Sequence, residues 1–92
     1  MTRVHLVISG RVQGVFFRQS SMSFAELNAV DGWVRNRPDG TVELVAQGSS
    51  DDVERFVEWC RKGPEMAKVT SIERTDAEPV SMPVGFYVRP TA

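Results

Sequence analysis

Apolar and polar residues alternate over several short stretches of the chain, and a period of two is typical of β-strands. The first stretch, residues 4–9, places Val4, Leu6 and Ile8 on one face. Val7 indicates that the other face is partly covered, as in a central strand. Further strands are predicted over residues 33–37, 41–47, 69–74 and 86–88.

The turn between the second and third of these strands is predicted from its own residues. Pro38 presets φ, Asp39 can bond back to the chain, and Gly40 accepts a positive φ. The strands over residues 33–37 and 41–47 are therefore expected to form a hairpin.

Two other stretches repeat apolar residues about one helical turn apart. The first predicts a helix over residues 17–29, with Met22, Ala25 and Ala29 on its apolar face and with Phe24 and Leu27 widening that face. Hydroxyls near its start are expected to serve the free amides of the first turns, and they belong to Ser20, Ser21 and Ser23.

The second predicted helix has clearer ends. Residues 49–52, two serines and two aspartates, supply cap hydroxyls and acids for the positive end of the helix dipole. Residues 62–64 end it with a lysine, a glycine and a proline. Its apolar positions follow the i, i+3, i+4, i+7 pattern and are Val53, Phe56, Val57 and Cys60.

The predicted elements follow the order βαββαβ, with a short C-terminal strand added. Two βαβ units that share one sheet give an α+β, ferredoxin-like split sandwich with a mostly antiparallel sheet. Right-handed crossovers place both helices on one face of that sheet. Residues 1–92 are expected to form a single domain, because a chain of this length builds one modest core.

Composition and charge narrow the classes of function. The chain is 41% hydrophobic and 25% charged, as in an ordinary soluble domain, and its net charge of −1 is unlike that of a nucleic-acid-binding protein. No stretch approaches the ~20 apolar residues of a membrane span, and the first residues lack the apolar run of a signal peptide. With one cysteine, Cys60, no internal disulfide can form. A cytoplasmic monomer without nucleic-acid or membrane partners is predicted.

The loop between the first strand and the first helix is a candidate anion site. The first amides of a helix have no internal partners, and the helix dipole favours an anion there. Gly14 allows a close approach of the backbone, and Arg18 offers a planar fork of donors suited to phosphate. In the alternative interpretation, Gly10 and Gly14 only turn the chain and Arg18 is a solvated helix residue. The loop is neither a Walker A motif nor a dinucleotide fingerprint.

Asn36 is a second candidate site residue. It shares a strand face with Val34, and Val34 is expected to face the core, so Asn36 would be an amide on the buried side. A buried amide needs partners. The alternative is that Asn36 caps the following turn through local backbone bonds.

The remaining chemistry-bearing residues suggest no other site. His5 is the only histidine and is expected on the sheet face that carries Arg3 and Val7, and Cys60 is expected in the core. They form no Ser/His/Asp or Cys/His set, and neither a metal nor a cofactor is predicted.

Two long motifs in register resemble the acylphosphatase family. Residues 10–18 read GRVQGVFFR, and residues 32–43 read GWVRNRPDGTVE. The resemblance continues through Gln47-Gly48, Gly63-Pro64, residues 67–69 and residues 86–89, so that it covers nearly the whole chain. At two places the chain departs from the family pattern: Phe16 stands where many bacterial members carry glycine, and Asn28-Ala29 stands where an apolar residue followed by glycine is usual.

The resemblance implies a ferredoxin-like fold and hydrolysis of the carboxyl–phosphate bond of a small acyl phosphate. Arg18 matches the family's phosphate-binding arginine, and Asn36 matches its water-orienting asparagine. The backbone cradle that contacts phosphate corresponds to Gly14, Val15, Phe16 and Phe17, with the side chain of Phe16 expected to point away from the ligand. Phe16 and Phe17 are both expected to anchor the loop against the core.

Two other functions are compatible with a fold of this class. One is a non-catalytic acylphosphatase-like module that binds an anion, against which intact Arg18 and Asn36 argue. The other is a ferredoxin-like RNA-binding module, which presents aromatic and basic groups on its central strands. Here those strands offer His5, Val7, Glu43 and Val45, which form a poor surface for stacking bases.

Overall fold

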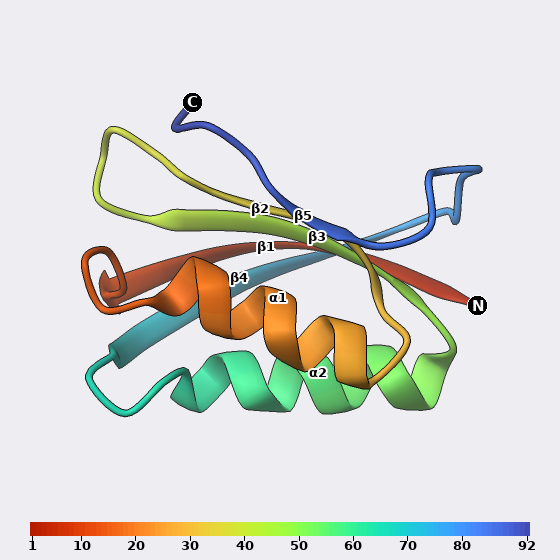
Figure 1. The fold of residues 1–92 in the computed structure, drawn as a ribbon, viewed down its shortest axis with the longest axis horizontal. Helices are drawn as coiled ribbons and strands as arrows, with labels where there is room; N and C mark the ends of the chain where they lie inside the picture. The colour runs from red at the N-terminus through yellow and green to blue at the C-terminus, as the bar shows by residue number, and fades with distance from the viewer.

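A five-stranded sheet and two helices make up the computed structural model, which describes residues 1–92 (Figure 1). In chain order the elements are β1 Thr2–Arg11, α1 Phe17–Leu27, β2 Asp31–Asn36, β3 Val42–Gly48, α2 Ser50–Lys62, β4 Lys68–Ala77 and β5 Phe86–Val88. The strand order across the sheet is β4-β1-β3-β2-β5. Neighbouring strands run antiparallel except β2 and β5, which are parallel. Both helices cover the same face, and the predicted fold class is therefore confirmed.

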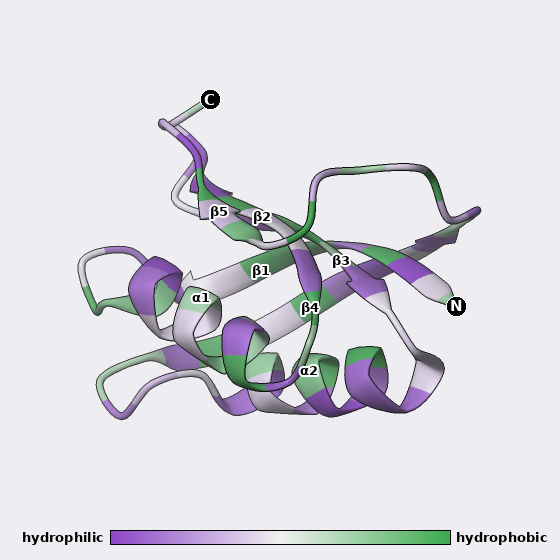
Figure 2. Cartoon of the chain, turned by 45° about the vertical axis from the view of Figure 1, so that its right-hand side comes forward, coloured by the Kyte–Doolittle hydropathy of each residue, from purple (hydrophilic) through white to green (hydrophobic).

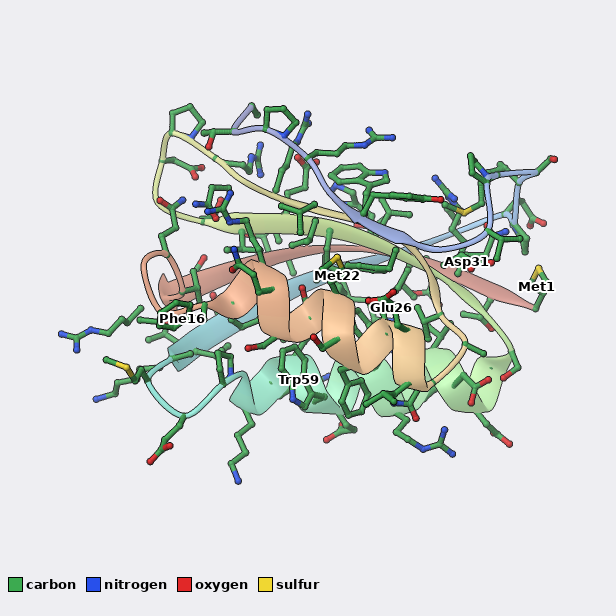
Figure 3. All side chains as sticks on the ribbon, viewed as in Figure 1. Met1, Phe16, Met22, Glu26, Asp31 and Trp59 are labelled. Carbon is green, nitrogen blue, oxygen red and sulfur yellow. The ribbon has the colours of Figure 1, made fainter.

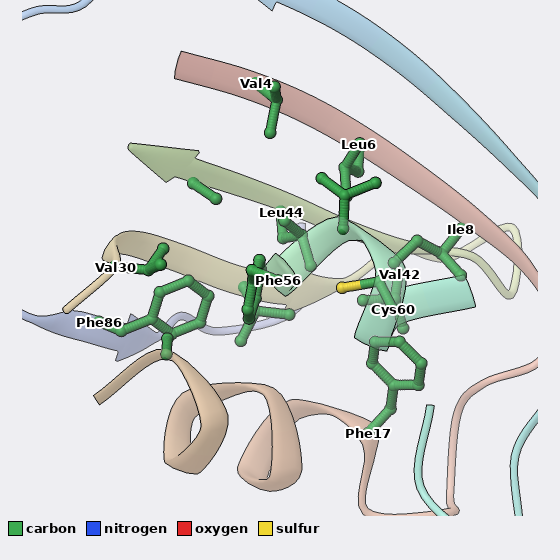
Figure 4. Close-up of a cluster of buried hydrophobic side chains, with 14 of the residues drawn as sticks. Val4, Leu6, Ile8, Phe17, Val30, Val42, Leu44, Phe56, Cys60 and Phe86 are labelled. Atoms are coloured by element: carbon green, nitrogen blue, oxygen red, sulfur yellow. The ribbon is translucent and has the colours of Figure 1, made fainter. Parts of the chain in front are cut away.

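The core lies between that face of the sheet and the two helices (Figure 4). Alternation in β1 buries Val4, Leu6 and Ile8 completely, as predicted from their spacing. Every residue of β3 is buried, because helices cover one face of this central strand and side chains and the connection between β4 and β5 cover the other. Figure 2 shows the matching hydropathy of α2, whose side toward the sheet is hydrophobic and whose outer side is hydrophilic.

The ends and the buried face of α2 confirm the prediction made from its sequence. The hydroxyl of Ser49 accepts a hydrogen bond from the Asp52 amide, and Gly63 ends the helix with φ 69°. The predicted apolar positions are its buried residues: Val53, Phe56, Val57 and Cys60.

The prediction for α1 was partly wrong. The helix ends at Leu27, and its buried residues are Phe17, Ser21 and Ala25. Leu27 is 86% exposed and lies at the open groove between the two helices instead of in the core. Ala29 is exposed and lies outside the helix, in a left-handed conformation.

A Schellman-type bond explains why α1 stops where it does. The Val30 amide donates back to the carbonyl of Ala25, and this bond requires the left-handed residue between the helix end and Val30. Val30 and Ala25 are both buried in the core, so the chain is pulled inward before β2 begins. No helix of the molecule combines the length and apolarity needed to cross a membrane.

Candidate active site

The loop between β1 and α1 is anchored by three buried side chains, those of Val12, Val15 and Phe17. Phe17 packs on the end of α2 at Gly63, where a Cβ would lie 2.8 Å from the phenyl ring. Phe16, by contrast, is 69% exposed at the N-terminal end of α1 (Figure 3). The prediction that both phenylalanines anchor the loop is therefore correct for Phe17 and wrong for Phe16.

The N-terminus of α1 has amides without protein partners. Its N-cap residue, Phe16, has φ 64° and makes no side-chain cap. The first helical bond runs from the Ser20 amide to the Phe16 carbonyl, so the preceding amides of the first turn have no helical acceptor. Expected capping by the serines was wrong, because the Ser21 hydroxyl is buried and donates to the Arg18 carbonyl. The first turn also lacks acidic residues, whereas that of α2 contains two.

A pocket of about 200 Å³ opens at this helix end. It joins the loop, the first turn of α1 and the last residue of β2, and its lining residues are Val12, Gly14, Phe16, Phe17, Arg18, Gln19 and Asn36. A Cβ on Gly14 would meet no protein atom within 4 Å, so the backbone there is open to a ligand. Of the five residues predicted to bind phosphate, which are the four of the backbone cradle and Arg18, all but Val15 line this pocket, and Val15 turns its side chain into the core.

Arg18 brings a free cation to the pocket. It is half-buried, and its guanidinium makes no hydrogen bond and no ion pair with the protein. A larger groove of about 410 Å³ between the helices is lined mainly by Phe24, Leu27, Trp59 and polar uncharged residues, so it lacks the positive charge that an anion requires.

Asn36 faces the core side of β2 beside the fully buried Val34, as its strand position predicts. Its Oδ1 is the only buried side-chain oxygen or nitrogen in the molecule without a hydrogen-bond partner. The capping alternative was wrong, because the carboxylate of Asp39 closes the turn by accepting from the amide and the hydroxyl of Thr41. A buried acceptor in this state calls for a donor such as a bound water.

Sequence reasoning gave no role to Gln13, which the structure places between the loop and the hairpin. Its side-chain amide donates to the carbonyls of Arg37 and Thr41, at 2.8 and 2.9 Å. The partners lie 24 and 28 residues away along the chain, so no local pattern could have revealed them.

Other reactive groups lie elsewhere. His5 is on the open face of the sheet, where its Nε2 lies 2.7 Å from a carboxylate oxygen of Glu43. Cys60 is fully buried, as predicted, and burial raises the pKa of its thiol far above the usual range, which removes it as a nucleophile. No three histidine, cysteine or acidic residues lie close enough together to hold a metal ion.

Comparison with known proteins agrees with this arrangement. The acylphosphatase family model matches residues 4–88. The chain is 48% identical over 91 residues to the acylphosphatase of Acidiphilium cryptum, covering 99% of both chains, and 50% identical over 78 residues to that of Thiobacillus denitrificans, covering 85% of this chain and 88% of the relative. It belongs to the acylphosphatase family. Its activity is accordingly that of a hydrolase acting on acyl phosphates.

The fold agrees with that of a solved member of the family. The crystal structure of acylphosphatase from Bacillus subtilis superposes with a TM-score of 0.92 at 35% identity, and the match covers 97% of this chain and 99% of the other.

Proposed function

We propose that the pocket between the phosphate loop and Asn36 is the active site and that it hydrolyses the carboxyl–phosphate bond of small acyl phosphates, releasing carboxylate and inorganic phosphate. One observation carries the proposal: an unpaired guanidinium, the free amides of a helix N-terminus and a buried partnerless amide oxygen meet around one small pocket.

The phosphate would be held by Arg18 and by the backbone amides of residues 14–17. A guanidinium donates two parallel bonds to a tetrahedral anion, and helix-end amides point in a common direction, so together they suit the three equatorial oxygens of a phosphoryl group. The groups are already in place, and their attraction grows as charge shifts in the transition state.

Asn36 would hold the attacking water through its Oδ1. The water oxygen bonds to phosphorus while the bond from phosphorus to the carboxylate oxygen breaks, and the carboxylate leaves with the electron pair. Arg18 is the only ionisable side chain lining the pocket, and a carboxamide is no base near neutral pH. The proton from the water therefore passes to an oxygen of the substrate's own phosphate.

The test is the hydrolysis of benzoyl phosphate by the intact chain and by Arg18→Ala. We expect the variant to stay folded and to lose about 10³-fold in kcat/KM, because its pocket retains no charged donor. Arg11→Ala is the matched control, since Arg11 is exposed at the end of β1 and does not line the pocket. Full turnover by folded Arg18→Ala would reject the assignment. Phosphate binding without turnover in the intact chain would favour the non-catalytic anion-binding module.

We further propose that residues 1–92 act as one domain and as a monomer in the cytoplasm. Support comes from the single hydrophobic core and from the one cysteine, which is buried and free. Light scattering on the purified chain tests the monomer, and a mass of twice 10.3 kDa would contradict it.

A further inference from the structure

Gln13 connects the two halves of the pocket. It belongs to the loop that carries Gly14 and leads to Arg18, and both hydrogens of its side-chain amide are bonded to the hairpin that follows Asn36. The contact joins segments that are not neighbours in the sequence and that belong to different elements, the loop before α1 and the turn between β2 and β3.

The two carbonyls that accept from Gln13 also close the hairpin. The Arg37 amide donates to the Thr41 carbonyl at 2.9 Å, and the Gly40 amide donates to the Arg37 carbonyl at 3.1 Å. Gln13 therefore bonds to two carbonyls that already take part in the hydrogen bonds of the turn, and its first acceptor belongs to the residue directly after Asn36.

We propose that Gln13 is a positioning residue for the hydrolysis. It holds the loop that binds the anion at a set distance from Asn36, so that the water and the phosphorus stay in line. This inference rests on the proposed function of the pocket. Without the two bonds the loop and the hairpin keep their own folds, but the distance between them is no longer set. In-line attack is sensitive to such a change, whereas anion binding by the loop and Arg18 alone is not.

The experiment compares Gln13→Met with the intact chain. Methionine keeps the length of the side chain and cannot donate. We expect kcat for benzoyl phosphate to fall by about 10- to 100-fold, as for a misplacement on the order of 1 Å. Inhibition by inorganic phosphate should change by less than about threefold, because its binding groups remain.

Gln47→Met is the matched control. Gln47 is a buried glutamine on β3 that also ties a loop by two bonds, to the amide and the carbonyl of Val80, but it lies at the far end of the strand from the pocket. It should lose stability without losing kcat. If Gln13→Met and Gln47→Met lose the same thermal stability and neither loses kcat, Gln13 is only structural and the proposal is wrong.

A second variant keeps the test decisive if Gln13→Met does not fold. In Gln13→Glu a carboxylate faces two carbonyl oxygens, and only its protonated form can donate to one of them. The kcat of this variant, divided by that of the intact chain at the same pH, should rise as the pH falls toward 4. A ratio independent of pH would overturn the positioning role.

If the intact chain hydrolyses no acyl phosphate, the proposed function fails and this inference falls with it. If the intact chain is active and Gln13→Met matches it, only the inference fails.

Discussion

At the residue scale, the site depends on polar groups that the protein leaves without partners. A buried amide oxygen without a hydrogen bond costs stability on the order of 1–3 kcal/mol. Asn36 carries such an oxygen, and the Arg18 guanidinium beside the same pocket is also unpaired. The cost is consistent with a site built to receive a water and an anion.

Asn36→Ala should therefore separate turnover from binding. We expect kcat to fall by about 10²-fold or more, because the water loses its acceptor, while inhibition by phosphate changes little. The free energy of unfolding of Asn36→Ala should not fall below that of the intact chain, since the change removes an acceptor that no protein group uses.

Asn28→Ala provides the comparison for this prediction. The Asn28 side chain donates to the Phe24 carbonyl at the end of α1, so its loss should cost about 1 kcal/mol and leave kcat unchanged. Steady-state kinetics and urea unfolding on both variants measure the difference. A loss of phosphate binding by Asn36→Ala with unchanged turnover of bound substrate would contradict the assigned role.

At the scale of elements, both ends of α1 contain a residue in the left-handed region that is not glycine. Phe16 has φ 64° and Ala29 has φ 55°, and these are the two positions at which glycine is usual in the pattern of the acylphosphatase family. A side chain in this region costs roughly 1–2 kcal/mol, so α1 is held at both ends by strained residues.

Ala29→Gly should stabilise the chain. Ala29 is exposed, so glycine loses no packing there and relieves the strain at the Schellman bond. After the added entropy of the unfolded chain, we expect a net gain of about 0.5–1 kcal/mol, which raises Tm by a few degrees. Ala77→Gly, at the exposed end of β4 where φ is not positive, should lower Tm instead. Thermal unfolding followed by circular dichroism gives both values, and a lower Tm for Ala29→Gly would show that the strain is absent.

At the scale of the whole molecule, an ionic cluster ties three strands together on the face of the sheet opposite the helices. Glu43 on β3 lies 2.7 Å from His5 of β1 and 2.7 Å from Arg35 of β2. Burial raises the pKa of Glu43, but the hydrogen bonds from His5 and Arg35 outweigh it and hold the pKa below its usual value. Arg35 also lies over the ring of Trp33, which Arg89 covers as well.

This cluster predicts a defined response to acid. Because the pKa of Glu43 is lower in the folded state, its contribution is present above the unfolded pKa of about 4.3 and is lost as the pH falls through the folded value. Glu43→Gln should be less stable than the intact chain at pH 7, by about 1–2 kcal/mol, and the difference should shrink toward pH 3.

Urea unfolding followed by tryptophan fluorescence at a series of pH values tests this response. Glu73→Gln is the control, since Glu73 is exposed on β4 and forms no ion pair. If the difference in the free energy of unfolding between Glu43→Gln and the intact chain stays constant from pH 7 to pH 3, the ionic cluster does not contribute to stability.

Local patterns in the chain were enough to predict the strands, α2 with its caps, and the side of β2 on which Asn36 lies. Each of these features depends on residues a few positions apart in the sequence. The strand or helix period and the capping side chains are therefore visible in the sequence itself. The roles of Arg18 and Asn36 came from the family resemblance rather than from spacing, because spacing alone left both residues with structural alternatives.

Contacts between distant segments could not be predicted in this way. Examples are the two bonds of Gln13 and the parallel pairing of β5 with β2. The exposure of Phe16 and Leu27 could not be predicted either, because it depends on where the other elements lie. A period specifies which side of an element faces inward, but not which other element lies against it. Strand register and helix packing bring Arg18 and Asn36 to one pocket, and these are properties of the whole fold.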